Sequence, residues 1–251
     1  MALALSKLLG CREQEAKAII AKYAGTVPVY TKKAKEAVVR IGKNIHKLPS
    51  GTGPCSAAHI QYLLKRGFAE EVVQTWQLQG TGPVGELDGI SYKLRLVAPI
   101  FWEGKQVSFQ ARDITNRADL KYITCSMERE VVHHKHIVYC HPEIDWALPI
   151  VVVEGITDVW RLGVQAVATF GIEFKNKQIR EICRKKKAAG DNRVAVMYDD
   201  DPQAVIQGAK MHAELAFRGM SPKTFSIQGD PGGMIQAEAD AYMDRILGSW
   251  D

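Results

Sequence analysis

Two apolar runs that end directly in acidic residues constrain the fold of this chain more than any other feature. The run Ile150–Val153 is followed by Glu154, and the run Val194–Tyr198 is followed by three aspartates, Asp199–Asp201. Short, β-branched and uncharged runs of this kind are typical of strands that are buried on both faces. We therefore predict two central strands of a parallel sheet, each with carboxylates at its carboxyl end.

Strand and helix patterns alternate around these runs, through the segment 149–251. This alternation predicts an α/β unit in which helices flank a parallel sheet. Because neighbouring parallel strands end at the same edge of a sheet, the two acidic sites should face one crevice, where such sheets bind ligands. The expected strands are Ile150–Val153, Ala166–Thr169, Val194–Tyr198 and Thr224–Ile227, and the expected helices are Asp158–Gly163, Lys175–Lys187, Gln203–Arg218 and Ile235–Leu247.

The segment 51–148 carries a different pattern, and we predict a smaller mixed α+β subdomain there. The turn residues of 48–54 mark its beginning. Its expected elements are helices over Ser56–Arg66 and Ala69–Gln77, a loop over Gly80–Gly89, and strands Tyr92–Phe101 and Gln106–Ile114 joined by a turn at Glu103–Lys105. The whole chain is therefore expected to be α+β with an α/β subdomain at its C-terminal side.

Residues 1–50 form a basic N-terminal segment that we predict to be helical. Apolar residues recur at helical spacing over 3–24 and 32–43. The segment has ten lysine or arginine residues against three acidic ones, whereas the remaining 201 residues carry a slight negative charge. This uneven distribution favours a polyanionic partner.

The composition is that of an ordinary globular chain. Hydrophobic residues make up 46% and charged residues 24% of the 251 positions, which excludes a disordered chain or a fibre. No uncharged run approaches the roughly 20 residues of a membrane span, and the N-terminus lacks the layout of a signal peptide. Five scattered cysteines without a CxxC pair fit reduced thiols. We therefore expect a cytoplasmic protein, in the host cytoplasm if it is viral, with no membrane partner.

The acidic residues after the two runs favour a divalent metal. In an extended segment Asp199 and Asp201 point the same way, and carboxylates held together repel one another unless a cation neutralises them. Clustered carboxylate oxygens suit Mg²⁺ or Mn²⁺, and the natural chemistry of such a site is phosphoryl transfer. A second reading stays open for Asp201, which precedes Pro202 and is well suited to cap the following helix.

The α/β segment contains three motifs in order, Glu154-Gly-Ile-Thr-Asp158, Ala168-Thr-Phe-Gly171 and Tyr198-Asp-Asp-Asp201. Together they resemble the TOPRIM domain that DnaG-type primases share with topoisomerases and some nucleases. The resemblance implies that Glu154, Asp158, Asp199 and Asp201 hold the catalytic metal. Where primases carry further acids late in this domain, the chain has Asp230 alone, and we include it among the expected metal ligands.

Motifs upstream of this domain are similar to the motifs of primases that carry basic binding residues. They are Tyr62-Leu-Leu-Lys-Arg66-Gly67, the hairpin that ends in Arg112, Lys121-Tyr122, and His134-Lys135. The resemblance implies that Arg66, Arg112, Lys121 and Lys135 bind nucleotide and template. The zinc-binding head and the helicase-docking module of the family have no counterpart in the sequence, so a separate helicase or zinc-domain protein is open as a partner.

The resulting hypothesis is a DNA primase, a DNA-directed RNA polymerase that makes short RNA primers on single-stranded DNA from ribonucleoside triphosphates. Glu154, Asp199 and Asp201 would be its catalytic residues, with Mg²⁺ or Mn²⁺ as cofactor, and crowding by the other acids should raise the pKa of Glu154. Two alternatives remain open: a TOPRIM nuclease, and a non-catalytic nucleic-acid-binding replication accessory protein. The small size is typical of viral or mobile-element replication proteins.

Histidines cluster at 133–136, with a further one at position 141. Strand spacing would put His134 and His136 on the same side of the chain. Because no cysteine pair completes a four-ligand site and His134 already fits the primase-like pattern, zinc is not expected here.

Overall fold

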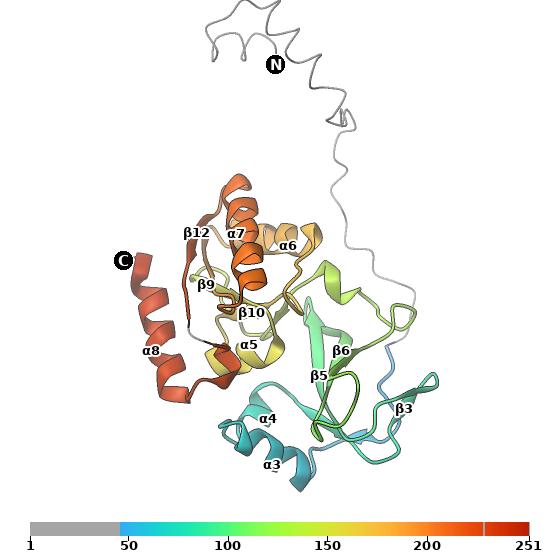
Figure 1. Cartoon of the computed structure of the whole chain (residues 1–251). Coiled ribbons are helices and arrows are strands. Elements are labelled where there is room, and N and C mark those ends of the chain that lie inside the picture. The colour runs from blue at the N-terminus through green and yellow to red at the C-terminus, as the bar shows by residue number, and fades with distance from the viewer. Residues whose placement is uncertain (1–45, 228, 251) are drawn as a thin grey trace, which may run out of the picture. The chain divides into compact units, whose positions relative to one another are not determined.

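The computed structural model describes residues 46–227 and 229–250 (Figure 1). The helices expected over 3–24 and 32–43 lie outside the described residues. The described part contains two five-stranded sheets, a two-stranded hairpin and several helices, so the mixed α+β class is confirmed.

The first sheet is antiparallel and has the strand order β1-β2-β5-β6-β7. Its longest strands, β5 and β6, form the predicted hairpin, and Glu103 and Gly104 in its turn both have positive φ (49° and 74°), as tight hairpin turns require. The strands are β1 (Thr52–Gly53), β2 (Gln79–Thr81), β5 (Arg95–Trp102), β6 (Lys105–Asp113) and β7 (Tyr122–Thr124).

The loop expected over Gly80–Gly89 is wrong in part. β2 extends to Thr81, and β3 (Glu86–Leu87) pairs with β4 (Ile90–Ser91) in a small separate hairpin. These strands are two or three residues long and contain glycine and polar residues, so no alternation could reveal them. Their pairing partners decide their conformation.

The second sheet has the strand order β12-β11-β9-β10-β8. Its four strands β9–β12 are parallel, as predicted, and β8 adds an antiparallel edge. β12 lies three residues earlier than expected, because this polar edge strand has no apolar pattern and takes its register from β11. The strands are β8 (Tyr139–Cys140), β9 (Ile150–Val153), β10 (Ala166–Ala168), β11 (Arg193–Val196) and β12 (Ser221–Thr224).

Helices cover both faces of the second sheet (Figure 1). Alternate residues of β9 point to opposite faces, so Val152 packs with the apolar side of α6 and α7, and Val151 and Val153 pack with α5 and α8. The helices are α5 (Ile156–Leu162), α6 (Asn176–Ala188), α7 (Pro202–Phe217) and α8 (Gln236–Leu247), with short 3₁₀ turns η1 (His134–His136), η2 (Pro231–Gly233) and η3 (Gly248–Trp250).

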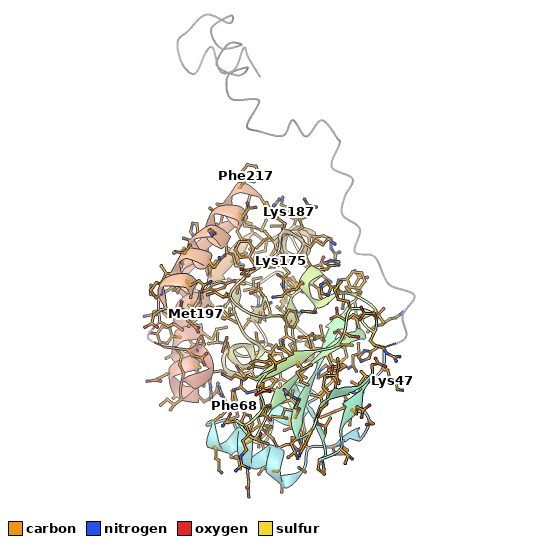
Figure 2. All side chains as sticks on the ribbon, turned by 45° about the vertical axis from the view of Figure 1, so that its right-hand side comes forward. Lys47, Phe68, Lys175, Lys187, Met197 and Phe217 are labelled. Atoms are coloured by element: carbon orange, nitrogen blue, oxygen red, sulfur yellow. The ribbon has the colours of Figure 1, made fainter. Side chains whose placement is uncertain are left out.

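The core that holds α5 also reaches the first sheet, and α3 (Ala57–Lys65) and α4 (Val72–Thr75) contribute buried residues to it. Figure 2 draws the side chains on the ribbon and labels two members of this core, Phe68, which follows α3, and Met197, which follows the strand β11. Buried side chains from both sheets, such as Ile100 and Val151, belong to the same cluster. The two regions therefore fold around one shared core.

A buried arginine on α5 fixes the junction between these regions. Arg161 is fully buried, and its guanidinium donates to the carbonyls of Arg66 (2.8 Å) and Gly67 (2.9 Å) at the end of α3. It also lies 4.1 Å from the centre of the Phe68 ring and contacts Gln236 of α8 at 3.2 Å. Charge-assisted hydrogen bonds from α5 to the end of α3 and to α8 hold α3 in a defined place beside the second sheet.

Among the described residues, none of the helices is both long enough and apolar enough to cross a membrane.

Candidate active site

Glu154, the first residue of the candidate site along the chain, directly follows β9. Its backbone carbonyl accepts a 2.7 Å hydrogen bond from the N–H of Gly171, in the turn after β10. Phe170 and Gly171 in that turn have positive φ (61° and 113°), a conformation that glycine adopts without strain. The end of β9 is thereby tied to the end of its neighbour, and the side chain of Glu154 is left at the carboxyl edge of the sheet.

Asp199, Asp200 and Asp201 follow the neighbouring strand, β11. Asp201 is the N-cap of α7, and its Oδ1 accepts from the backbone N–H groups of Gln203 (2.9 Å) and Ala204 (3.1 Å). The capping role left open for Asp201 is therefore observed. It uses one carboxylate oxygen and leaves the second available to a ligand.

One carboxylate oxygen from each of Glu154, Asp199 and Asp201 lies within 4.8 Å of the other two. Burial, followed by the charge of Asp199, raises the pKa of Glu154 to about 7. Burial, followed by the charges of Asp230 and Asp201, raises the pKa of Asp199 to about 6. The raised pKa values of Glu154 and Asp199 show that negative charge is crowded here, so a bound cation would stabilise the site.

The donor set fits a hard divalent cation. Glu154 Oε1 is buried and has no hydrogen-bond partner among the described residues, which is costly for a carboxylate oxygen unless something binds it. The three residues offer only oxygen ligands, which Mg²⁺ and Mn²⁺ prefer. Glu154, Asp199 and Asp201 are the residues that would hold such an ion.

Asp158 and Asp230 form a second acidic pair beside these three residues. Asp158 lies at the start of α5 and is buried; its Oδ2 accepts from the N–H of Gly155 (2.8 Å). The N–H of Gly232 is shared between Asp158 Oδ1 (3.2 Å) and Asp230 Oδ1 (3.0 Å). Burial and a hydrogen bond to the Asp230 carboxyl raise the pKa of Asp158 well above its ordinary value, which favours the protonated form of Asp158.

Glycine at position 232 is required by this arrangement. A Cβ atom there would lie 2.8 Å from Asp158 Oδ1 and 3.3 Å from Thr157 Oγ1. Any side chain would force these groups apart. The backbone N–H of Gly232 therefore reaches the two carboxylates because nothing but hydrogen projects from its Cα.

Arg112 comes from β6 and is buried between two tyrosine rings. Its guanidinium carbon lies 4.8 Å from the ring centre of Tyr122 and 5.7 Å from that of Tyr62, and its nitrogens donate to both hydroxyl groups. Tyr122 Oη in turn lies 3.4 Å from Thr157 Oγ1, one residue before Asp158. The two aromatic faces hold the cation in a fixed orientation next to the start of α5.

Arg66 and Lys121 lie on the same side of the site as Arg112. Partial burial and the charges of Arg112 and Arg66 lower the pKa of Lys121, and the charges of Asp230 and Asp158 act on it in the opposite direction. Three of the four basic residues singled out from the sequence are therefore near the second acidic pair. Arg66 Nε is buried without a hydrogen-bond partner among the described residues.

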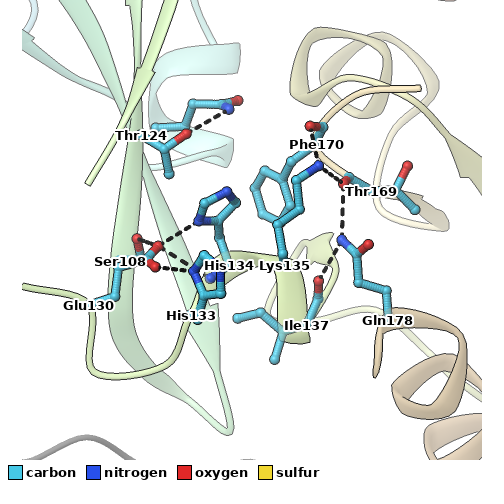
Figure 3. Close-up of polar contacts among 11 residues, drawn as sticks. Ser108, Thr124, Glu130, His133, His134, Lys135, Ile137, Thr169, Phe170 and Gln178 are labelled. Carbon is cyan, nitrogen blue, oxygen red and sulfur yellow. Dashed lines mark hydrogen bonds and ion pairs between the residues drawn. The ribbon is translucent and has the colours of Figure 1, made fainter. Parts of the chain in front are cut away.

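Lys135 does not lie with the other three basic residues, and its ammonium group binds backbone carbonyls of the protein (Figure 3). Its ammonium group donates to the carbonyls of Phe170 (2.8 Å) and Thr169 (3.1 Å) and comes within 3.5 Å of that of Glu173. Burial, followed by the charge of Lys175, lowers its pKa. In this structure Lys135 holds the turn that ties β10 to Glu154.

The histidine cluster is organised around a buried carboxylate. Glu130 accepts from Ser108 Oγ (2.7 Å) and faces Nδ1 of both His133 (2.5 Å) and His134 (2.7 Å), as Figure 3 shows. The strand spacing expected for His134 and His136 is wrong, because they lie in η1 and His136 Nε2 contacts Lys177 Nζ instead (2.7 Å). Although the Glu130, His133 and His134 donors lie within 4.8 Å of one another, the carboxylate already accepts these hydrogen bonds.

Sequence reasoning missed three features of this site: the tyrosine sandwich around Arg112, the shared N–H of Gly232, and the anchoring role of Arg161. Their partners lie 50, 74 and 95 residues away in the chain, so no local spacing marks them. One signal was present for Gly232, because an Asp-Pro-Gly-Gly turn is a place where a close backbone approach is common.

Comparison with solved structures relates this arrangement to primases. The chain is similar to the RNA polymerase domain of Mycobacterium tuberculosis primase DnaG, with a TM-score of 0.60 and 20% identity over 77% of each chain. The same domain in complex with double-stranded DNA matches at 0.61 and 19%, over 77% of this chain and 73% of that one.

A structure of the Aquifex aeolicus primase, with its zinc-binding and RNA polymerase domains, matches with a TM-score of 0.64 and 17% identity, over 99% of this chain and 70% of that one. At these identities the likeness shows a common fold, so the chain has the fold of the primase RNA polymerase domain. Neither a protein-family model nor a curated protein matches the sequence.

Proposed function

We propose that this chain is a primase-type RNA polymerase that uses Mg²⁺ or Mn²⁺ to make short RNA primers on single-stranded DNA, and that its second sheet is a TOPRIM domain. One observation carries the proposal: oxygens of Glu154, Asp199 and Asp201 converge within 4.8 Å at the ends of two parallel strands. The shared fold with primase RNA polymerase domains supports it.

The acidic residues would hold the metal and prepare the reacting groups. When bound, the metal would activate the attacking hydroxyl and neutralise charge on the triphosphate. Asp199 and Glu154 would supply half-buried carboxylates, and Asp201 would supply its non-capping oxygen while its capping bonds keep the side chain in place. The Asp158 and Asp230 pair is held by Gly232 beside them and shapes the local negative field.

The basic residues would bind the anionic substrates. Hydrogen bonds to two tyrosine hydroxyls restrict the guanidinium of Arg112, so this residue would offer a fixed positive charge next to α5. Lys121 is exposed, so its side chain can adjust its position to contact a phosphate. Arg66 adds a third positive charge on the same side. Nucleic-acid phosphates and a triphosphate are the partners that such a group of cations recognises.

The decisive test is de novo primer synthesis on single-stranded DNA with ribonucleoside triphosphates and either Mg²⁺ or Mn²⁺. Wild type should make short RNA products, and Asp199→Asn should lose at least 100-fold in rate, on the order of a lost charge-stabilising group. Asp244→Asn, an exposed change on α8, serves as the matched control and should keep the rate.

The alternative activities give different outcomes in the same assay. Cleavage of the DNA without added nucleotides would replace the polymerase assignment with a nuclease. Salt-dependent DNA binding without products in either metal would favour an accessory protein. Primer synthesis that persists in Asp199→Asn would refute the proposed role of the acids.

A further inference from the structure

A cavity of about 320 Å³ opens next to the acidic residues, between the first half of α7 and the end of β12. Asp199 and Asp200 line one end of it, so the cavity begins where the candidate metal site ends. Ligands of parallel sheets bind at the carboxyl ends of the strands, and this cavity lies at those ends of β11 and β12. Its size is within the range of pockets that take small organic ligands.

Small side chains on α7 create this space. Ala204, Gly208 and Ala209 face the cavity, and a Cβ atom at Gly208 would meet Tyr198 only at ordinary contact distance, 3.7 Å. A larger residue could therefore begin at position 208 without a backbone clash, yet the helix has glycine there. The cavity is therefore open because α7 has small residues along this side.

The walls of the cavity are mainly apolar, with polar groups at its ends. Val205, which is 58% exposed, and Phe225 and Ile227 from the chain after β12 supply apolar surface. His212 Nδ1 and Thr224 Oγ1 lie 3.0 Å apart and offer hydrogen-bonding groups away from the carboxylates. An apolar slot with a few polar groups suits a flat heteroaromatic ring, which stacks on apolar surface and hydrogen-bonds at its edge.

We infer that this cavity is the subsite for the base of a nucleoside triphosphate whose phosphates lie at Glu154, Asp199 and Asp201. The inference rests on the proposed function, because it assumes that the acidic site holds a metal-bound triphosphate. Asp199 joins the two parts: it contributes to the metal donor set and also lines the cavity. One nucleotide can thus span both, with its anionic end at the acids and its apolar end against α7.

The test compares two ligands in equilibrium calorimetry with saturating Mg²⁺ and no template: ATP, and inorganic tripolyphosphate, which has the phosphates without the base. Ala209→Phe fills the cavity from an exposed helix position, and Ala213→Phe, also exposed on α7 but not lining the cavity, is its matched control. Ala209→Phe should bind ATP about tenfold more weakly, as expected for a lost stacking contact. Its affinity for tripolyphosphate, and both affinities of Ala213→Phe, should stay within twofold of wild type.

A second variant keeps the test decisive if Ala209→Phe fails to fold. Val205→Ser removes apolar surface at the exposed rim and should weaken ATP binding about threefold without affecting tripolyphosphate. The assignment is overturned if wild type binds both ligands equally, if the cavity variants leave ATP binding unchanged, or if they weaken both ligands alike.

This measurement does not depend on polymerisation. Base-dependent binding that is lost in the cavity variants, in a protein that makes no primers, would support the subsite and contradict the proposed function. Primer synthesis by a protein that binds nucleotide without any contribution from the base would do the opposite.

Discussion

The acidic site should make the metal-free protein less stable as the pH rises. In the unfolded chain the carboxyl of Glu154 ionises near its ordinary pKa of 4.5, whereas burial and Asp199 raise the pKa in the folded protein to about 7. Between these values the folded state binds a proton that the unfolded state has released. This contribution to stability is therefore present below pH 4.5 and is lost as the pH rises through 7.

The size of the effect follows from the same shift. A change from 4.5 to about 7 corresponds to roughly 3 kcal/mol if it acts in full. Because Glu154 is only half-buried, solvent screening reduces this to about 1.5 kcal/mol. For a folded unit of this size, that difference should move the melting temperature by roughly 3–6 °C.

Glu154→Gln removes the ionisation, so it should stabilise the protein by about 1.5 kcal/mol at pH 8 in EDTA and change little at pH 4.5. Saturating Mg²⁺ should stabilise wild type at pH 8 and should have a smaller effect on the variant. Glu70→Gln, which neutralises an exposed glutamate, is the matched control and should show neither change.

The assay is thermal unfolding at pH 4.5, 6 and 8, each with EDTA and with Mg²⁺. A variant Glu154→Gln that is less stable than wild type at pH 8, or a difference that is the same at every pH, would refute the reasoning. Either result would mean that Glu154 is a structural hydrogen-bonding residue.

Three further predictions concern residues around the site. Lys135→Met should lower the free energy of unfolding in urea by about 2 kcal/mol, because the carbonyls that its ammonium group contacts lose a charged donor; a higher ribonucleotide KM at unchanged stability would instead identify a nucleotide contact. Arg161→Met should cost about 3 kcal/mol in the same measurement by leaving two backbone carbonyls without their donor, and wild-type stability would contradict the anchoring role. Gly232→Ala should cost about 1–3 kcal/mol because its Cβ would crowd Asp158, whereas Gly233→Ala, whose Cβ meets nothing within 4 Å, should be near neutral.

The hydrophobic pattern of the sequence predicted the bounds of helices and strands well wherever one face of the element is buried and apolar residues recur regularly. The strand β9 was predicted with the correct ends, and the helices α6, α7 and α8 within one residue at each end, because each presents a continuous apolar run or stripe. The edge strands β8 and β12 were missed or shifted, since one is two residues long and the other reads Ser-Pro-Lys-Thr. Edge strands take their position from a neighbour and not from their own periodicity.

The histidine segment shows the same limit. A strand over His134–His136 was the natural reading of its sequence, but the structure has a 3₁₀ turn there. Glu130 accepts from the backbone N–H of His134 as well as facing its ring, and this local partner favours the turn. A buried carboxylate four residues away decides the conformation, and its burial could not be read from the sequence.

Two buried parallel strands that end in carboxylates can be predicted from the sequence alone, because each apolar run and its acids are adjacent in the chain and alternation sets the sides to which they point. The sequence does not show which partner each charged side chain contacts. The convergence of Glu154, Asp199 and Asp201 is predicted from the sequence, whereas the pairing of Asp158 with Asp230 and the contacts of Lys135 with the turn after β10 follow from the folded chain alone. These contacts join segments 34 to 74 residues apart, so the packing of whole elements, rather than any local spacing, brings their atoms together.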